Sequence, residues 1–321
     1  MIPTYNGTAY LEQALRSVLD QDPGPQAMQI EVVDDCSTEG DPAELVRAVA
    51  GDRVLYHRQP ENTGYIANFE TCLQRSRGHL VHLLHDDDAV RPGFYDRLAA
   101  GFAARPDVGA AFCRSIYMEP DGHWESFTVL EQREPGVLDD WLWKIATGPR
   151  LTTPSLVVTR RAYEALGGFD RRQRFAGEDW EMWVRLASRY PVWYEPEPLA
   201  LYRVRRPSSL TSRSSSSGEI ALEMRRAAEI IESYLPEHLP GDGATRMTRY
   251  ARDEFARWSV VEATGLLAAG RPVAAAGRAR EAWRTSPTPT VAGWLATGAA
   301  RVLGRAVQAG VRRSRDAVRR G

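Results

Sequence analysis

The stretch Leu80-Val81-His82-Leu83-Leu84-His85-Asp86-Asp87-Asp88 decides the fold, because a short apolar segment runs directly into four polar residues. A short apolar run is typical of a buried strand. In an open α/β sheet, ligands bind beyond the carboxyl ends of the strands. The acidic run is therefore a candidate site.

Two interpretations of the acidic run remain open from these residues alone. Adjacent carboxylates repel each other, and Mg²⁺ or Mn²⁺ would relieve that repulsion because both cations prefer oxygen ligands. A solvated acidic loop would also be stabilised by the N-terminal dipole of a helix beginning near Pro92. The run by itself favours neither interpretation.

The residues around this stretch alternate between apolar segments and helical patterns. The periodicity predicts helices over 9–21, 42–50, 66–75 and 94–104, and strands over 30–33, 54–56, 80–84 and 109–117. Strand and helix in turn indicate βαβ units. We therefore expect an α/β fold of the Rossmann-like kind, with a mostly parallel central sheet and helices on both of its faces.

The rest of the chain is less regular. We expect a hairpin turn at Asp121-Gly122, irregular structure over 123–150, a strand at 156–158, a helix over 181–188 and an extended segment over 194–203. Residues 208–218 are rich in Ser and indicate a linker. Turn signals thin out after this segment, so 219–321 is expected to form several helices.

Composition excludes some functions. The net charge of −1 gives no field that would gather nucleic acid. Cys36, Cys72 and Cys113 suggest neither a disulfide framework nor a zinc site, and they fit a reducing cytoplasm. No apolar stretch reaches ~20 residues, so no membrane-spanning helix is expected. Almost no strand precedes the first turn, and we expect the true start to lie upstream.

Six motifs point to one family. They occur in the order Pro3-Thr4-Tyr5-Asn6-Gly7, Val32-Val33-Asp34-Asp35-Cys36-Ser37, Asn62-Thr63-Gly64, His85-Asp86-Asp87-Asp88 with Pro92, Gly167-Gly168-Phe169-Asp170 and Gly177-Glu178-Asp179-Trp180. Over about residues 1–212 the chain resembles a family 2 glycosyltransferase with the GT-A fold. The resemblance implies inverting transfer of a sugar from a nucleoside diphosphate, with UDP favoured, to an acceptor hydroxyl. It also implies a role in cell-surface polysaccharide synthesis.

The resemblance implies a nucleotide site built from residues that follow the first strands. Its members are Pro3, Thr4, Tyr5, Asp35, Asn62 and Asp86. Tyr5 would lie against the base, Asp35 would accept a hydrogen bond from base or ribose, and Asp86 would face the ribose. On their own, Tyr5 could be a core aromatic residue and Asn62 is favoured as a helix cap. Asp34 is favoured as a helix cap.

The resemblance also implies a divalent cation, Mg²⁺ or Mn²⁺, with Asp87 as its direct ligand. The family often carries Asp-x-Asp here, and His85 stands at the first of those positions. Asp88 would then lie behind the ligand. The loss of the first Asp leaves the metal geometry open.

Asp179 is implied as the catalytic base, because inverting transfer needs a carboxylate to take the proton of the acceptor. Glu178 would hold the acceptor or a helix end, and both residues could instead be an acidic cap for the next helix. Trp180 is a candidate platform for a sugar, with simple packing as the equal alternative. Arg205 stands where the family commonly has His, and it could hold diphosphate oxygens or lie on a basic surface loop.

The domain organisation follows from these motifs. We expect a glycosyltransferase domain over 1–212, with a nucleotide-sugar half (1–115) and an acceptor half (116–212), then a linker over 213–218 and a helical region over 219–321. The acceptor would be a glycan or a lipid-linked glycan. Residues 295–321 form a basic amphipathic pattern that could lie on the inner face of the cell membrane. A helix packed on its own domain is the plainer alternative, and the expected location is the cytoplasm.

Two other functions compete with sugar transfer. A sugar nucleotidyltransferase would need a Gly-rich basic loop after the first strand, and Tyr5-Asn6-Gly7-Thr8 is not such a loop. A catalytically inactive nucleotide- or glycan-binding protein is kept open by His85 and Arg205.

Overall fold

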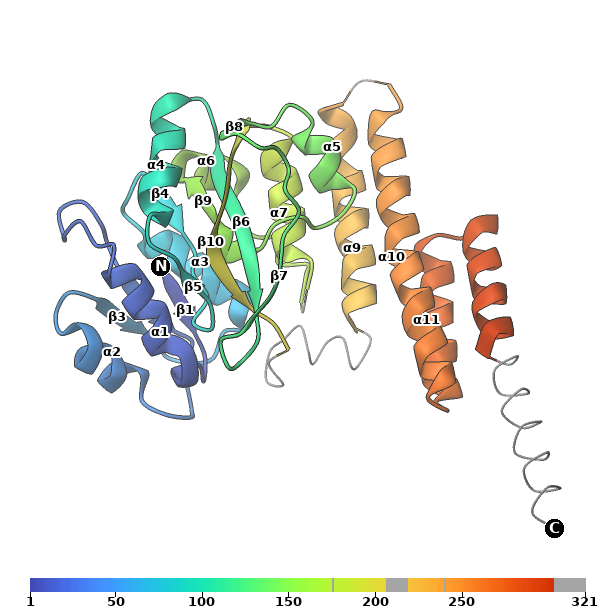
Figure 1. The fold of residues 1–321 in the computed structure, drawn as a ribbon, viewed down its shortest axis with the longest axis horizontal. Coiled ribbons are helices and arrows are strands. Elements are labelled where there is room, and N and C mark those ends of the chain that lie inside the picture. The colour runs from blue at the N-terminus through green and yellow to red at the C-terminus, as the bar shows by residue number, and fades with distance from the viewer. Residues whose placement is uncertain (175, 206–218, 240, 303–321) are drawn as a thin grey trace, which may run out of the picture. The chain divides into compact units, whose positions relative to one another are not determined.

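The computed structural model describes residues 1–174, 176–205, 219–239 and 241–302 (Figure 1). The chain forms two compact units, residues 1–213 and 214–321. None of the helices within the described ranges has the length and apolar character needed to cross a bilayer. The predicted linker over 213–218 and most of the basic tail fall outside these ranges.

The first half of the N-terminal unit alternates strands and helices as predicted. Its elements are β1 (Ile2–Thr4), α1 (Thr8–Leu19), β2 (Glu31–Asp34), α2 (Pro42–Ala50), β3 (Leu55–Arg58), α3 (Tyr65–Arg75), β4 (Leu80–His82), β5 (Ala89–Val90) and α4 (Phe94–Ala104). Strands β1, β2 and β3 are all parallel. Apolar residues at helical spacing, such as Leu11, Leu15 and Val18, bury one face of α1.

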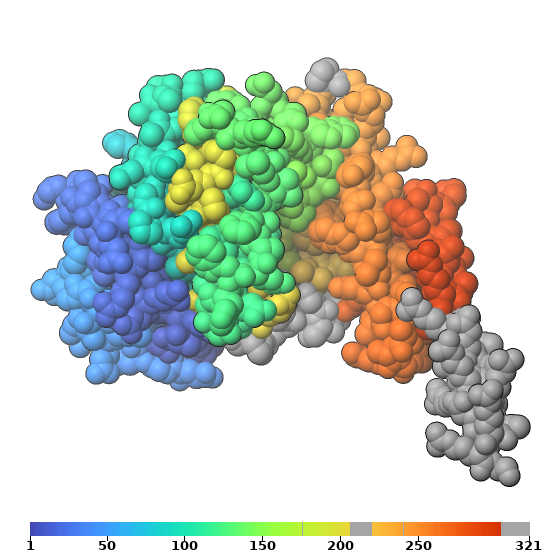
Figure 2. All heavy atoms as spheres, viewed as in Figure 1, coloured from blue at the N-terminus to red at the C-terminus, as the bar shows by residue number. Residues whose placement is uncertain are grey.

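The second half of this unit holds the longest strands. Its elements are β6 (Ala110–Met118), β7 (Trp124–Phe127), β8 (Gly136–Val137), α5 (Trp141–Ala146), the 3-10 turn η1 (Thr153–Ser155), β9 (Leu156–Thr159), α6 (Arg160–Leu166), α7 (Glu178–Ala187) and β10 (Val192–Arg203). The segment predicted to be irregular therefore contains β7, β8 and α5. In the space-filling view, side chains of this green segment cover much of the visible face of the unit (Figure 2).

The strands form two sheets joined through Met1. The order is β1-β2-β3 in the first sheet and β4-β9-β6-β10-β5 in the second. The Met1 amino group donates to the His82 carbonyl at 2.9 Å, and the Leu84 amide donates to the Met1 carbonyl at 3.0 Å. This link places β1 beside β4, so the ends of both strands contribute to one site.

The predicted fold class is confirmed, but the second sheet is mixed rather than mostly parallel. Only β6 and β10 are parallel there, whereas β4 and β6 run antiparallel to β9 and β5 runs antiparallel to β10. Helices α1, α2 and α4 pack on one face of the strands in a core that includes Leu15, Val46 and Phe94. Helices α3 and α6 also contact the strands, and Phe69 of α3 packs on Phe169.

The C-terminal unit is helical, as predicted. It contains α9 (Glu219–Tyr234), the 3-10 turn η2 (Leu235–Glu237), α10 (Gly243–Ala268) and α11 (Pro272–Thr285), and residues 289–302 are also helical. Ala256, Val260, Ala282 and Val291 form one cluster of its core, where small side chains allow helices to approach closely. Arg225 pairs with Glu281 at 2.7 Å and links α9 to α11.

Candidate functional site

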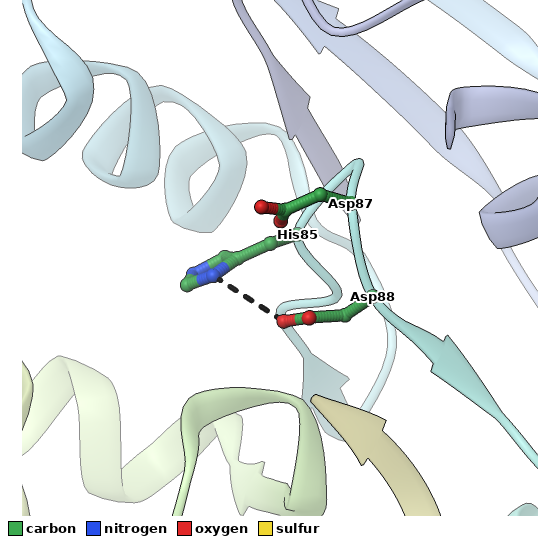
Figure 3. Close-up of side chains that lie close together, drawn as sticks. All are labelled: His85, Asp87 and Asp88. Atoms are coloured by element: carbon green, nitrogen blue, oxygen red, sulfur yellow. Dashed lines mark ion pairs between the residues drawn. The ribbon is translucent and has the colours of Figure 1, made fainter. Parts of the chain in front are cut away.

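The acidic run forms a tight loop between β4 and β5. The Asp88 amide donates to the His85 carbonyl at 3.1 Å, which folds the loop back on itself. As a result, His85, Asp87 and Asp88 each offer one ligand atom within 4.8 Å of the others (Figure 3). The His85 ring stacks on Phe69 with a centroid distance of 5.2 Å and an interplanar angle of 15°. The loop thus gathers one imidazole and two carboxylates.

Asp88 is the buried member of this cluster. Its side chain is 1% exposed, and Oδ1 accepts the Arg203 amide at 2.8 Å. Oδ2 accepts no hydrogen bond from any described residue and lies 3.7 Å from His85 Nδ1. Burial raises the pKa of the Asp88 carboxyl well above its usual value, and the charge of Asp87 adds to the rise. A buried carboxylate oxygen that lacks a donor is well suited to a cation, so the residues present fit the implied metal.

Arg203 holds the acidic run through hydrogen bonds to Asp87 and Asp88, a role that the sequence did not predict. This buried residue ends β10, and its guanidinium donates to the Asp87 carbonyl at 2.8 Å. It also donates to the Glu119 carbonyl and to Gln13 Oε1, and it lies 4.1 Å from the centre of the Tyr10 ring. An extended segment ending in Tyr-Arg carries no signal for such a role, because its partners come from three distant parts of the chain.

Asp86 points to β1. Thr4 Oγ1 donates to Asp86 Oδ2 at 2.5 Å, and Asp86 is 8% exposed. A Cβ added to Gly7 would lie 1.6 Å from the same oxygen. Gly7 is therefore required because the Asp86 carboxylate occupies the space of a side chain, which the motif alone did not reveal.

Replacing Gly7 by Ala is expected to displace Asp86 and to weaken nucleotide binding about tenfold, or roughly 1.4 kcal/mol. Isothermal titration with nucleoside diphosphates measures the loss. Gly277→Ala is the matched control, since a Cβ there meets no atom within 4 Å. Equal affinity in Gly7→Ala and wild type would show that the position of Asp86 does not matter for the nucleotide.

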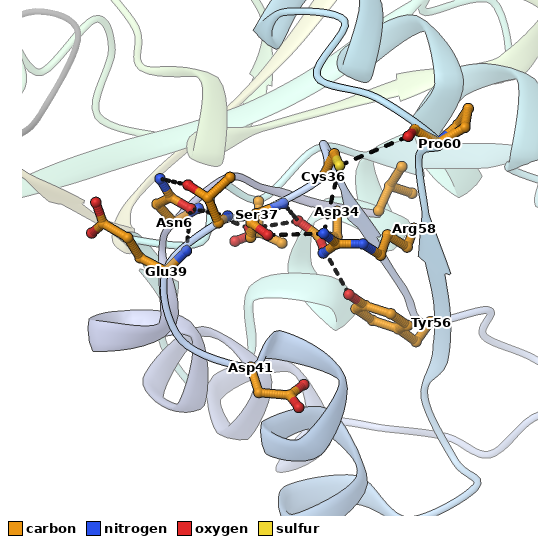
Figure 4. Close-up of polar contacts among 12 residues, drawn as sticks. Asn6, Asp34, Cys36, Ser37, Glu39, Asp41, Tyr56, Arg58 and Pro60 are labelled. Carbon is orange, nitrogen blue, oxygen red and sulfur yellow. Dashed lines mark hydrogen bonds and ion pairs between the residues drawn. The ribbon is translucent and has the colours of Figure 1, made fainter.

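Asp34 holds the loop after β2 (Figure 4). Asp41 is the N-cap of α2, the helix that follows, so the interpretation of Asp34 as a helix cap is wrong. The fully buried carboxylate accepts the Ser37 amide at 2.9 Å, the Tyr56 hydroxyl at 2.7 Å and Arg58 Nη1 at 2.6 Å. Burial, together with Asp34, raises the pKa of Tyr56 to about 12. Asn6 lies in the loop after β1, and its backbone amide donates to Ser37 Oγ in the loop after β2 at 2.9 Å. This hydrogen bond ties the two loops together.

Asp35 shapes the next turn. Its Oδ1 accepts the Thr63 amide and hydroxyl, both at 2.8 Å, and Oδ2 accepts the Gly64 amide at 2.9 Å. With 2% of the residue exposed, a bond to the nucleotide would have to use the remaining lone pair of Oδ2. Asn62 is exposed, and Gly64 with φ 87° is the N-cap of α3. The interpretation of Asn62 as a helix cap is therefore wrong.

The first motif presents one ring to solvent. Pro3 and Thr4 are buried in β1, whereas Tyr5 is 48% exposed. Tyr5 is thus not a core aromatic residue, and its ring is available to a flat ligand.

Asp179 lies in the first turn of α7, close enough to His85 for their charges to interact. Its Oδ1 accepts the Trp180 amide at 2.6 Å, and Thr153 Oγ1 donates to Oδ2 at 3.4 Å. Burial raises the pKa of Asp179 above its usual value, and the charge of His85 opposes the rise. Glu178 accepts the Tyr65 hydroxyl at 2.9 Å. The candidate site therefore combines the acidic run with a half-buried carboxylate from the second half of the unit.

Two predicted side chains occupy other positions. Trp180 is 1% exposed, and its Nε1 donates to the Ile145 carbonyl at 2.6 Å. The prediction that its ring stacks on a sugar is therefore wrong, and the alternative of simple packing is correct. Arg205 has φ 56° and forms ion pairs with Glu119 and Glu125. Binding of a diphosphate by Arg205 would have to compete with both carboxylates.

A parallel three-stranded sheet is followed by a mixed sheet, and an acidic run lies at the end of β4. This arrangement is that of the GT-A class. A model of the family described as Glycosyl transferase family 2 matches residues 1–161, which is half of the chain. The chain belongs to this family. The predicted resemblance is therefore confirmed.

Relatives from bacteria share part of the chain. The uncharacterized protein MT1568 of Mycobacterium tuberculosis is 31% identical over 214 residues, which are 63% of this chain and 65% of that protein. The O-antigen biosynthesis protein RfbC of Myxococcus xanthus is 24% identical over 202 residues, which are 58% of this chain and 16% of that protein. The chain spans less than two thirds of either relative.

Solved structures share the fold. Residues 1–349 of S. aureus TarS in complex with UDP-GlcNAc match with a TM-score of 0.61 and 15% identity, over 88% of this chain and 90% of that one. The mannosyltransferase PcManGT from Pyrobaculum calidifontis in complex with GDP-Man and Mn²⁺ matches with a TM-score of 0.56 and 19% identity, over 94% and 79%. At these identities the likeness establishes the fold alone.

Proposed function

We propose that the chain is an inverting glycosyltransferase that moves a sugar from a nucleoside diphosphate to an acceptor hydroxyl. The observation that carries this proposal is the cluster of His85, Asp87 and Asp88 at a strand end, together with Asp179, whose carboxyl interacts electrostatically with His85. A cation site and a carboxylate that can accept a proton are the two chemical elements that such a transfer needs. Residues 1–115 would hold the donor, and 116–212 would hold the acceptor.

The donor would lie across the ends of β1, β2 and β4. The exposed Tyr5 ring would stack on the base above Pro3 and Thr4, and Asp86 would accept a ribose hydroxyl. Asn62 and Asp35 would border this pocket from the turn before α3. Asp87 would hold a divalent cation, which supplies positive charge to the departing diphosphate.

Asp179 would act as the base. As the acceptor oxygen forms its bond to the anomeric carbon, the acceptor proton passes to the Asp179 carboxylate. The bond between that carbon and the diphosphate oxygen breaks on the opposite face, so the configuration inverts. Thr153 and the Trp180 amide fix the carboxylate in position before the reaction. Glu178, held by Tyr65, would border the acceptor.

The comparisons support finer choices. RfbC is named for O-antigen biosynthesis, and the TarS structure contains UDP-GlcNAc. We therefore propose UDP as the nucleotide and a cell-surface glycan, free or lipid-linked, as the acceptor. Such an acceptor would place the enzyme at the inner face of the membrane.

The nucleotide class is tested by thermal shift with UDP, GDP and dTDP, each with and without Mn²⁺. One nucleotide is expected to raise the melting temperature, and the rise is expected to need the cation. At 100 times Kd a ligand stabilises the folded state by about 2.7 kcal/mol, so the shift is measurable. No shift with any diphosphate would contradict the proposed donor site.

A second candidate is a nucleotide-binding protein without catalytic activity. It is favoured by the ion pairs of Arg205 with Glu119 and Glu125, which compete with the binding of a diphosphate. Slow hydrolysis of the sugar nucleotide, measured as released diphosphate, separates the two functions. A nucleotide-dependent thermal shift without any hydrolysis or transfer would favour the second.

A further inference from the structure

The donor atoms of the metal cluster are one imidazole nitrogen and two carboxylate oxygens. We propose that His85 is itself a metal ligand, and that His85, Asp87 and Asp88 select a first-row transition-metal cation over Mg²⁺. The inference rests on the proposed function, since it specifies the cation of the same site. It narrows the choice between Mg²⁺ and Mn²⁺ on the basis of this chain's own residues.

The geometry supports ligation by His85. All three ligand atoms lie within 4.8 Å of one another, and His85 Nδ1 is 3.7 Å from Asp88 Oδ2 (Figure 3). Two ligand atoms that each lie ~2.0–2.2 Å from one cation are separated by at most about 4.4 Å, and the 3.7 Å between Nδ1 and Oδ2 is within that limit. A cation could therefore enter with small side-chain movements, and the buried Asp88 Oδ2 would gain a partner.

The ring and the carboxylate are held before any cation binds. Stacking on Phe69 fixes the plane of the His85 imidazole. The Arg203 amide fixes Asp88 through Oδ1, and the Arg203 side chain holds the Asp87 carbonyl. Ligands that are already oriented lose little entropy when a cation binds. The held His85 ring therefore adds to the affinity for the cation.

The donor set decides between cations. Mg²⁺ demands near-ideal octahedral geometry, favours oxygen and keeps several waters. Imidazole favours first-row transition metals, whose affinity for mixed nitrogen and oxygen sites rises from Mn²⁺ along the series. An imidazole in place of a carboxylate also removes one negative charge, which weakens Mg²⁺ most because its binding is chiefly electrostatic. Mn²⁺ is the most stringent probe, since it is the weakest binder of that series.

The test uses electron paramagnetic resonance of Mn²⁺ bound to the full chain, alone and with each of the three nucleoside diphosphates. Electron spin-echo modulation is expected to detect a directly bound ¹⁴N in wild type and to lose it in His85→Asp. Competition of Mn²⁺ by Mg²⁺ gives the ratio of their affinities. This ratio is expected to fall about tenfold in His85→Asp, because Mg²⁺ gains a carboxylate ligand.

The controls separate this inference from the proposed function. His79→Asp makes the same change at an exposed position and is expected to keep both the nitrogen signal and the affinity ratio. Bound Mn²⁺ without a nitrogen signal, or an unchanged ratio in His85→Asp, overturns ligation by His85 while leaving the metal-dependent function intact. Failure of Mn²⁺ to bind under all conditions overturns both the inference and the metal role of Asp87.

Discussion

Replacing Asp179 by Asn is expected to lower the rate of sugar transfer by about 10²–10⁴-fold, because the base is lost while its shape is kept. The Asn carbonyl can still accept the Trp180 amide, which the Asp179 carboxylate accepts at 2.6 Å. The variant should therefore fold, and the metal-dependent thermal shift with the nucleotide should persist. Product formation with the identified donor measures the effect.

Asp139→Asn is the control for this prediction, since Asp139 is exposed before α5 and belongs to no part of the site. It should transfer sugar like wild type. Turnover by Asp179→Asn at the wild-type rate would remove Asp179 as the base. A loss of nucleotide binding together with activity would assign the residue to donor binding instead.

Replacing Asp87 by Asn is expected to remove the cation dependence of nucleotide binding and to lower transfer on the order of 10³-fold. Asp87 supplies one of three ligand atoms that lie within 4.8 Å of one another. Arg203 holds the main-chain carbonyl of Asp87 independently of its side chain. The loop should thus keep its shape when the carboxylate becomes an amide. Titration of Mn²⁺ against the melting temperature, followed by an activity assay, reports both effects.

The comparison of the two variants is decisive. Asp179→Asn should bind donor and cation but not react, whereas Asp87→Asn should fail to gain affinity from the cation. Asp96→Asn, at an exposed position in the first turn of α4, controls for loss of an acidic charge. A normal Mn²⁺-dependent shift in Asp87→Asn would contradict its role as a ligand.

Much of the N-terminal fold could be predicted from local patterns. Apolar spacing in α1 and the short apolar segment at β4 are encoded within a few residues, so the order of strands and helices through α4 follows directly from the sequence. The prediction of irregular structure over 123–150 was wrong because β7 is exposed at every residue and depends on pairing with β6. Its sequence therefore lacks the alternation of apolar and polar residues that indicates a strand. Helix α6 was missed although Thr159 caps its start and Gly167 ends it with φ 83°.

The candidate site was predictable in its members but not in their contacts. Motif order gave Asp86, Asp87 and Asp179, whereas their placement depends on pairings far apart in sequence. Trp180 shows the difference: an aromatic residue beside a catalytic motif looks the same whether its ring faces a sugar or, as here, the core and the Ile145 carbonyl. Arg203 could not be found at all, because its partners lie up to 190 residues away.

Arg203 also bears on how the unit acquires function during folding. Its amide bonds Asp88 across 115 residues, and its side chain reaches the Asp87 carbonyl across 116. The acidic loop therefore gains its full set of supports only after β10 has joined the sheet, and contacts of such long range form late and slowly. A chain that ended before β10 would consequently lack these supports for the acidic loop. The arrangement of His85, Asp87 and Asp88 is thus a property of the completed unit, acquired when the last strand is added.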